Sequence, residues 1–309
     1  MSREMLALSH RTNNRTLLLD ALLWLGHDYV ELGDAENMMR VRNEFVERVE
    51  QTPSPWHRYM AEGSRVLEAS VYGDLAGARA LSERLMGLGR QVQDDLAETF
   101  HLLRMLFFDV QQATFGPQPE VDPRQRLEVP AAVAADYHPF WALRWVTHGQ
   151  LEAARALLQR TMQDQHRLLD VLRRPILCAM SVVAARLGEQ ELARELYGLL
   201  SPAAGRHMLL RACVYMGPVD HYLGVLAAAL AQHEAAVGHF ERALEIGMSP
   251  VLQIQTQQEF GRFLASSCDG PGHARERANK LLESSRQSAQ LYGLMARGAA
   301  GALTSETVI

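Results

Sequence analysis

Lysine is almost absent from this chain of 309 residues, in which Lys280 is the one lysine among 31 basic residues. Aspartate and glutamate together number 36, so the formal net charge is −5, and the arginines are scattered rather than gathered in a stripe. A protein that binds nucleic acid through the phosphates usually carries a basic surface. The sequence therefore predicts no direct contact with nucleic acid.

Cysteine is also scarce, and long apolar runs are missing. Cys178, Cys213 and Cys268 share no CxxC spacing, and such a sparse, odd set is typical of a reducing compartment. The longest apolar run, residues 223–231, is far shorter than the roughly 20 residues that cross a bilayer. Residues 1–10 lack the apolar core of a signal peptide. We therefore expect a cytoplasmic protein without a membrane span.

The motifs of common catalytic and metal sites are missing as well. His233 and His239 resemble a zinc-binding HExxH pair only superficially, because a separation of six residues turns them apart on a helix. Neither a G-x-x-x-x-G-K-[ST] phosphate loop nor a G-x-S-x-G nucleophile elbow occurs. The sequence thus predicts no catalytic residue, no metal site and no cofactor.

The sequence does contain a repeat of about forty residues, marked by a glycine that Asp, Gln or Glu follows. Gly33, Gly73, Gly149 and Gly188 carry this mark. After the last three glycines, an alanine and then a leucine recur at spacings that place both on one face of a helix. An apolar segment of helical period precedes each mark, so the predicted unit is a helix, a tight turn at the glycine and a second helix.

No segment alternates between apolar and polar residues as a half-buried strand does, and the prolines fall near expected helix starts. We therefore predict an all-α fold, an α-solenoid of about seven helix-turn-helix pairs wound as a right-handed superhelix. A lone helix over 2–11 comes first. The pairs follow at 15–32 and 35–51, 55–72 and 74–89, 95–112 and 123–134, 138–147 and 150–163, 167–187 and 189–200, 215–231 and 233–246, and 250–267 and 272–291. One repeat domain covers residues 1–297, with an alternative boundary at the proline-rich segment 113–130 and a frayed tail over 298–309.

Residues 220–246 carry the sharpest form of the repeat. A small residue stands where two helices are expected to cross, and a large one fills the next gap, as in a tetratricopeptide repeat. The matching positions are Leu223, Gly224, Ala236, Phe240 and Ala243. The period of about forty rather than 34 residues makes the units tetratricopeptide-like.

Residues 15–295 resemble the C-terminal helical-repeat arm of large bacterial signalling ATPases, which include MalT-like LuxR-type transcriptional regulators and multidomain adenylate/guanylate cyclases. The resemblance rests on segments 75–84, 196–202, 222–227, 239–244 and 277–282. The nucleotide-binding, DNA-binding and cyclase modules of those proteins have no counterpart in this sequence. The resemblance therefore implies a regulatory arm without their activities, either excised from a larger protein or standing alone.

In tetratricopeptide arrays the first helix of each pair lines a concave groove, and the same frame places ten side chains there. Most of them are apolar, which suits a protein or peptide partner, for example an amphipathic helix. The ten are His27, Val30, Leu67, Leu143, Val146, Val182, His221, Val225, Gln258 and Arg262. Two alternatives stay open: the residues pack only between helices, or the tail of the chain fills the groove.

A second candidate site lies at Trp141 and Trp145, four residues apart and close to His138. This cluster could form the floor of a pocket for a small-molecule effector, or a packed helix interface.

Three functions follow as hypotheses. The first is a non-catalytic scaffold that binds a protein or peptide partner within a bacterial regulatory system. The second is an effector-sensing arm of a transcriptional regulator or cyclase that binds a small molecule, and the third is an enzyme on a helical-repeat scaffold. A homodimer is also compatible with the unpaired first helix.

Overall fold

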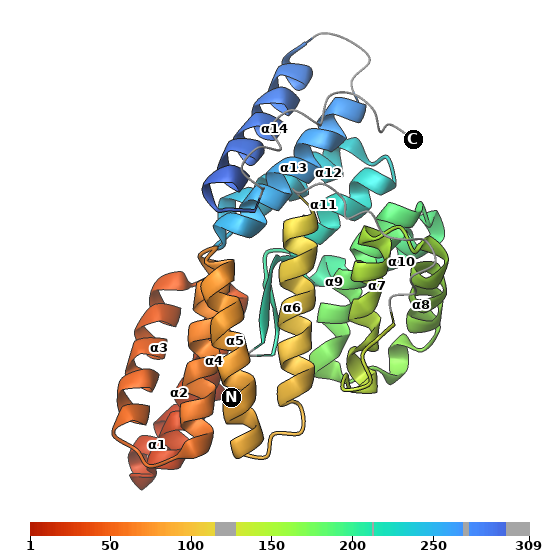
Figure 1. The fold of residues 1–309 in the computed structure, drawn as a ribbon. Coiled ribbons are helices and arrows are strands. Elements are labelled where there is room, and N and C mark those ends of the chain that lie inside the picture. Colours follow the sequence, from red (N-terminus) through yellow and green to blue (C-terminus); the bar gives the residue numbers. More distant parts are fainter. Residues whose placement is uncertain (115–127, 212, 268–271, 295–309) are drawn as a thin grey trace.

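The chain folds into an array of helix pairs that surrounds one short β-hairpin (Figure 1). The computed structural model describes residues 1–114, 128–211, 213–267 and 272–294. Within these ranges successive helices pack against each other along the chain, which confirms the predicted all-α helical-repeat fold. The predicted tail over 298–309 and most of the alternative boundary 113–130 lie outside the described residues.

The elements follow in chain order. The first six helices are α1 (Ser2–Thr12), α2 (Arg15–Leu32), α3 (Ala35–Glu50), α4 (Pro55–Val71), α5 (Leu75–Gln91) and α6 (Ala97–Ala113). The middle of the chain forms η1 (Ala135–Phe140), α7 (Trp141–Thr147), α8 (Leu151–Gln163), η2 (Gln165–Arg167), α9 (Asp170–Leu187), α10 (Gln190–Leu200) and η3 (Ser201–Ala203), where η denotes a 3-10 helix. The last part forms β1 (His207–Leu210), β2 (Val214–Pro218), α11 (Val219–Ala229), α12 (His233–Ile246), α13 (Pro250–Ser266) and α14 (His273–Leu291).

The glycine-acid mark of the sequence ends one helix and begins the next. Gly33 has a φ of 72°, and the Asp34 side chain accepts a hydrogen bond of 3.1 Å from a backbone N–H in the first turn of α3. Gly73, with a φ of 88°, and Asp74 repeat the arrangement before α5, where the bond is 2.8 Å. A left-handed glycine closes a helix and an aspartate caps the next one, so two adjacent residues make a complete turn.

Small residues stand where the helices cross, as the repeat pattern predicts. Ala78, Ala154 and Ala193 are buried. At Gly224 an added Cβ would lie 2.8 Å from the ring of Phe240, so only glycine lets α11 and α12 approach this closely. Close packing in such interiors leaves no room for even one methyl group.

The predicted helix over 123–134 is wrong in the part that the structure describes. Residues 128–134 form turns and extended backbone, and 123–127 lie outside the described residues. Pro130 has no N–H to donate and disfavours helical backbone in the residue before it, which opposes a helix through this segment.

The structure also contains a short β-hairpin that the sequence pattern does not predict. β1 and β2 pair antiparallel, with His207 opposite Pro218, Leu210 opposite Val214 and a bulge after Met208. Every residue of both strands is buried. Strands that are buried on both faces do not alternate between apolar and polar residues, so the sequence pattern does not reveal them. For the same reason the helix predicted over 215–231 begins too early, since α11 begins at Val219.

The hairpin lies inside the helical array. β1 contacts α2 and α9, and β2 contacts α4, α6 and α11. Figure 1 shows the two strands running beside α6, between the N-terminal helices and α9.

The last helices return to the first ones. The Ser249 hydroxyl, before α13, donates a hydrogen bond of 2.8 Å to the carbonyl of Val71 at the end of α4. Val251 and Ile254 of α13 share an apolar cluster with Leu75 of α5. The array therefore closes on itself around the hairpin. Among the helices of the described ranges, none has the length and apolar character that a bilayer crossing requires.

Candidate functional site

The hairpin occupies the concave face on which the sequence predicts a partner groove. Val30 of α2 packs against Leu209 of β1 and Tyr215 of β2, and Leu67 of α4 lies in the same cluster. An internal segment of the chain therefore lies against these two predicted groove residues. The tail, which is the other predicted occupant of the groove, lies outside the described residues. Residues of the hairpin or its turn line three cavities in the described part of the chain.

The first cavity, the α2–α4 pocket, has a volume of about 90 Å³ and walls that are mostly apolar. Three predicted groove residues, His27, Val30 and Leu67, line it together with Tyr215.

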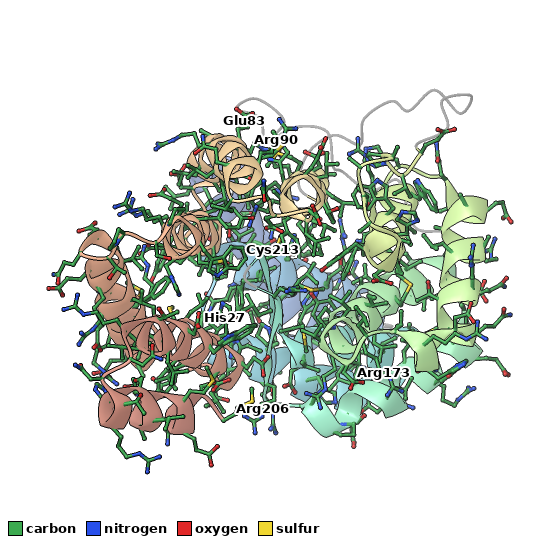
Figure 2. All side chains as sticks on the ribbon, turned by 90° about the horizontal axis from the view of Figure 1, so that it is seen from below. His27, Glu83, Arg90, Arg173, Arg206 and Cys213 are labelled. Carbon is green, nitrogen blue, oxygen red and sulfur yellow. The ribbon has the colours of Figure 1, made fainter. Side chains whose placement is uncertain are left out.

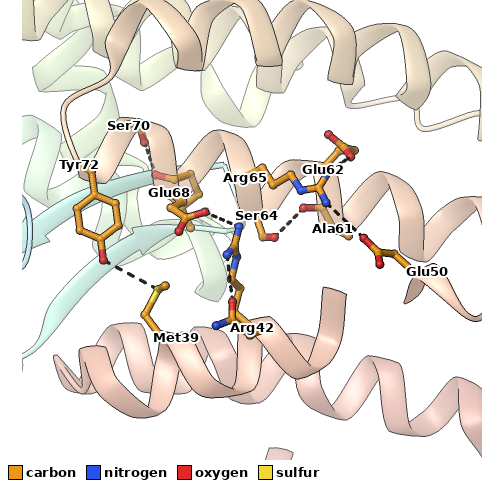
Figure 3. Close-up of polar contacts among 12 residues, drawn as sticks. Met39, Arg42, Glu50, Ala61, Glu62, Ser64, Arg65, Glu68, Ser70 and Tyr72 are labelled. Carbon is orange, nitrogen blue, oxygen red and sulfur yellow. Dashed lines mark hydrogen bonds and ion pairs between the residues drawn. The ribbon is translucent and has the colours of Figure 1, made fainter. Parts of the chain in front are cut away.

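Polar contacts between α3 and α4 border this pocket, as Figure 3 shows. Arg42 forms an ion pair with Glu68, and the Tyr72 hydroxyl lies 4.0 Å from the sulfur of Met39. All four residues line the cavity. The pocket thus combines an apolar interior with a polar rim.

The second cavity, the α9 pocket, also has a volume of about 90 Å³. Tyr215 and Met216 of β2 line it together with four predicted groove residues. The four are Leu143, Val146, Val182 and His221. Burial lowers the pKa of His221 to about 4, against the opposing effect of Glu259. The imidazole is therefore neutral at pH 7, and its Nδ1 lies 2.9 Å from the Thr256 hydroxyl.

The other three predicted groove residues lie outside these cavities. Val225 packs with the cluster around Phe240, and Gln258 is buried with its amide donating to the Thr114 carbonyl at 3.3 Å. Arg262 lies 3.4 Å from Glu259 on its own helix. The contacts of Val225 and Gln258 join neighbouring elements, whereas that of Arg262 stays within α13.

The predicted effector cluster does not line any of the three cavities. Trp141 is buried in the main apolar core, and Trp145 packs against that core. The His138 ring lies 3.0 Å from the Val133 carbonyl and fixes the segment before α7. The packed interface is thus the interpretation that the contacts favour.

The third cavity, the aromatic pocket, is the largest of the three at about 150 Å³. It lies between α2, α4, α6 and the hairpin turn, and shares His27 with the α2–α4 pocket. Its aromatic side chains are Trp24, Trp56, Tyr59 and Phe100. Trp24 and Trp56 are each 44% exposed, so the cavity reaches the surface beside them.

A buried arginine on α6 forms part of this pocket. Arg104 is only 4% exposed, and its Nε donates a hydrogen bond of 3.3 Å to the Cys213 carbonyl in the hairpin turn. In the described part of the chain, no carboxylate lies within ion-pair distance of it. Arg211, also at the pocket, lies with its guanidinium 5.7 Å from the ring centre of Phe100.

The two carboxylates at the aromatic pocket have other partners. Asp20 lies 3.1 Å from His57 Nε2, and Asp94 accepts a hydrogen bond of 2.7 Å from the Tyr59 hydroxyl. Burial lowers the pKa of His27 to about 4, with Asp28 opposing and Arg211 reinforcing the shift. His27 is therefore neutral at pH 7.

Figure 2 shows His27 and Cys213 in the interior, between the N-terminal helices and the rest of the molecule. Only His27 of the aromatic pocket is among the residues predicted from the sequence. A sequence signal for the aromatic pocket does exist. Two aromatic residues stand three positions apart on α2, at Trp24 and His27, and again on α4, at Trp56 and Tyr59.

Across the described residues, no group of three or more His, Cys, Asp or Glu side chains could hold a metal ion. The cavities offer apolar and aromatic walls with few charged groups, an arrangement suited to binding small molecules. Comparison with known proteins finds no protein-family model, curated protein or solved structure that matches this chain.

Proposed function

We propose that this chain is a helical-repeat arm that binds a small molecule beside its internal hairpin. One observation carries the proposal: a hairpin with two buried strands packs against predicted groove residues of α2 and α4, and its residues help to line three cavities. Peptide recognition by such arrays needs an open groove. Small molecules need only enclosed, mostly apolar pockets with a few polar groups.

The position of the hairpin supports a sensing role. It contacts α2 and α4 on one side and α6, α9 and α11 on the other. A ligand that binds one arrangement of these elements more tightly shifts the population toward it. The resemblance to arms of transcriptional regulators and cyclases favours such an effector-sensing role in the cytoplasm of a bacterium.

The test is a ligand screen on the complete chain by ligand-observed NMR, together with mass spectrometry of compounds released when the purified protein is denatured. We expect at least one compound that binds and raises the melting temperature. If nothing co-purifies and no compound in a broad metabolite library binds, the proposal fails.

A matched pair of variants assigns the pocket. A Cβ at Gly26 of α2, which lines the α2–α4 pocket, meets no atom within 4 Å, and the same holds for the exposed Gly198 of α10. Gly26→Leu fills the cavity, whereas Gly198→Leu adds the same side chain outside every described pocket. Binding that only Gly26→Leu abolishes belongs to the α2–α4 pocket, and binding that survives belongs to one of the other two.

A protein or peptide partner, including a second copy of this chain, is the second candidate. The exposed Trp24 and Trp56 favour it, because exposed aromatic residues are common in protein interfaces. Hydrogen exchange separates the two functions. A small molecule beside the hairpin slows exchange of the amides over 207–218, whereas a peptide in the groove must displace the hairpin and speed their exchange.

A further inference from the structure

We propose that the aromatic pocket takes a small aromatic carboxylate, with the acid group on Arg104 and the ring among the aromatic side chains. This inference rests on the proposed function, because it names the ligand class of one of the three pockets.

The first argument is the state of Arg104. A guanidinium carries five N–H donors, and in the described residues only Nε has an acceptor, the Cys213 carbonyl. The side chain is 4% exposed and lines the cavity. A buried charge without a counter-ion is costly, and a carboxylate pairs with the two Nη groups through two parallel hydrogen bonds. An anion in the cavity would supply the partner that the two Nη groups lack among the described residues.

The second argument concerns the competing charges around the pocket. Asp20 is turned to His57, and Asp94 accepts hydrogen bonds from the Tyr59 hydroxyl and the backbone N–H of Leu96. Both carboxylates are thus engaged away from Arg104. Arg211 adds a second positive charge at the same cavity, and the neutral imidazole of His27 adds none.

The third argument is size and wall chemistry. The volume of about 150 Å³ equals that of an engineered cavity known to bind benzene, so the space admits one ring. Aromatic rings stack favourably in offset or edge-to-face contacts. Trp24 and Trp56 at the surface and Tyr59 and Phe100 further along the lining provide such contacts.

A ligand on Arg104 would also reach the hairpin. The guanidinium that binds the acid group already holds the carbonyl of Cys213 in the hairpin turn. Occupancy of the pocket therefore fixes the turn against α6, and we expect slower amide exchange over 207–218 when the ligand binds.

Isothermal titration of the complete chain with phenylacetate and benzoate at pH 7.5 tests the inference, and phenylacetamide and benzamide serve as neutral isosteres. We expect the acids to bind and the amides to bind about 30-fold more weakly, because the charge-assisted pair is lost. Arg104→Gln should weaken acid binding to a similar degree. Arg194→Gln, an exposed arginine on α10 outside the three pockets, should leave it unchanged.

Arg104→Gln also removes a contact to the hairpin, so Trp56→Ala provides a second variant in an exposed position. It should weaken acid binding through loss of ring contact while the fold persists. Equal binding of acids and amides, or full binding by a folded Arg104→Gln, would overturn the inference.

The same titrations separate this inference from the proposed function. If no aromatic acid binds but another compound from the metabolite screen does, the ligand class is wrong and the small-molecule function stands. If no compound binds in either experiment, both fail.

Discussion

Asp220 is a carboxylate with no exposed surface, and four elements meet at it. One oxygen accepts a hydrogen bond of 2.6 Å from the backbone N–H of Gly205, and the other lies 2.9 Å from His239 Nδ1. The far nitrogen of that imidazole lies 3.0 Å from the Tyr197 hydroxyl. This chain of hydrogen bonds joins α10, α11, α12 and the segment before β1. It lies outside the three pockets and acts on stability.

The pH dependence of stability should reveal this network below pH 4. Burial raises the pKa of Asp220, but hydrogen bonds from His239 and Gly205 outweigh it, so the folded-state pKa lies below the ordinary value of 3.8. Its stabilisation is therefore present above pH 3.8 and is lost as the pH falls through the lower folded-state pKa. At pH 7, Asp220→Asn should cost about 2 kcal/mol in urea unfolding.

The comparison of wild type and Asp220→Asn across pH supplies the control. The difference between their unfolding free energies should shrink as the pH falls below 3.8. A difference that stays constant down to pH 2 would show that the negative charge contributes nothing.

The burial of His207 predicts a second range of pH in which the stability of the protein changes. Its ring stacks on Tyr215, its Nδ1 lies 2.5 Å from the Tyr215 hydroxyl, and burial lowers its pKa to about 4. The unfolded chain binds a proton near pH 6.5 and the folded chain does not, so stability falls as the pH drops from 6.5 toward 4. The pKa values of His27, His101 and His221 shift in the same direction.

Replacement of His207 should flatten that decline. In His207→Gln, the loss of unfolding free energy between pH 6.5 and 4.5 should be smaller, because one of four histidines with a lowered pKa is removed. Chemical denaturation at several pH values measures it, and His233→Asn, an exposed substitution, is the control. An unchanged slope in His207→Gln would contradict the prediction.

At the scale of elements, the sequence predicts the helices well and the hairpin not at all. Gly33 with Asp34 and Gly73 with Asp74 make turns from two adjacent residues, so local chemistry alone marks them. The hairpin is buried on both faces, which erases the alternation that identifies most strands.

The candidate pockets were predictable only in part. The repeat frame finds residues that face inward, such as Val30 and Leu143, because each helix repeats the same geometry. The aromatic pocket joins residues of α2, α4, α6 and the hairpin turn, for example Trp24 with Arg104 and Cys213. Apart from the Trp24–His27 and Trp56–Tyr59 spacings, this combination depends on tertiary packing and leaves no pattern in the sequence.

Alanine substitutions at two glycines with nearly the same backbone conformation can test whether the hairpin packs against α2. Gly33 and Gly188 end α2 and α9 with φ values of 72° and 70°. A Cβ at Gly33 would lie 2.6 Å from His207 Nε2, whereas one at Gly188 meets nothing within 4 Å. Gly188→Ala should cost about 1 kcal/mol for the left-handed backbone alone, and Gly33→Ala about 2–3 kcal/mol.

Urea unfolding of both variants measures this difference. Equal losses would mean that β1 does not lie against the end of α2. The pair is informative because the backbone penalty is common to both positions and cancels in the comparison.

At the scale of the whole molecule, the last two helices contact the turn between α4 and α5, which links parts of the array that are far apart in the sequence. A Cβ at Gly73, between α4 and α5, would lie 2.5 Å from the ring of Tyr292, which follows α14. Val251 of α13 lies beside the same glycine. Repeat arrays in which each unit contacts only its neighbours unfold in parts, whereas closure couples the two ends.

Tyr292→Ala tests this coupling. We expect a loss of about 1–3 kcal/mol, less than for a fully buried aromatic residue, and faster amide exchange in the turn over 71–75. Leu291→Ala is the matched control, because Leu291 is the adjacent residue and is 83% exposed. If both variants lose the same small amount and the turn over 71–75 exchanges as in the wild type, the ends are not coupled.

Because the hairpin is buried against early helices, those helices cannot complete their packing until the hairpin has been synthesised. Val30 and Leu67 emerge from the ribosome early, yet the side chains that cover them, Leu209 and Tyr215, follow about 150 to 180 residues later. At 5–20 residues per second, that interval lasts roughly 10–40 s. Throughout it, α2 and α4 present apolar faces that nothing on the nascent chain yet covers. The first helices of the array are thus made first, but their apolar faces are covered only after the hairpin has followed.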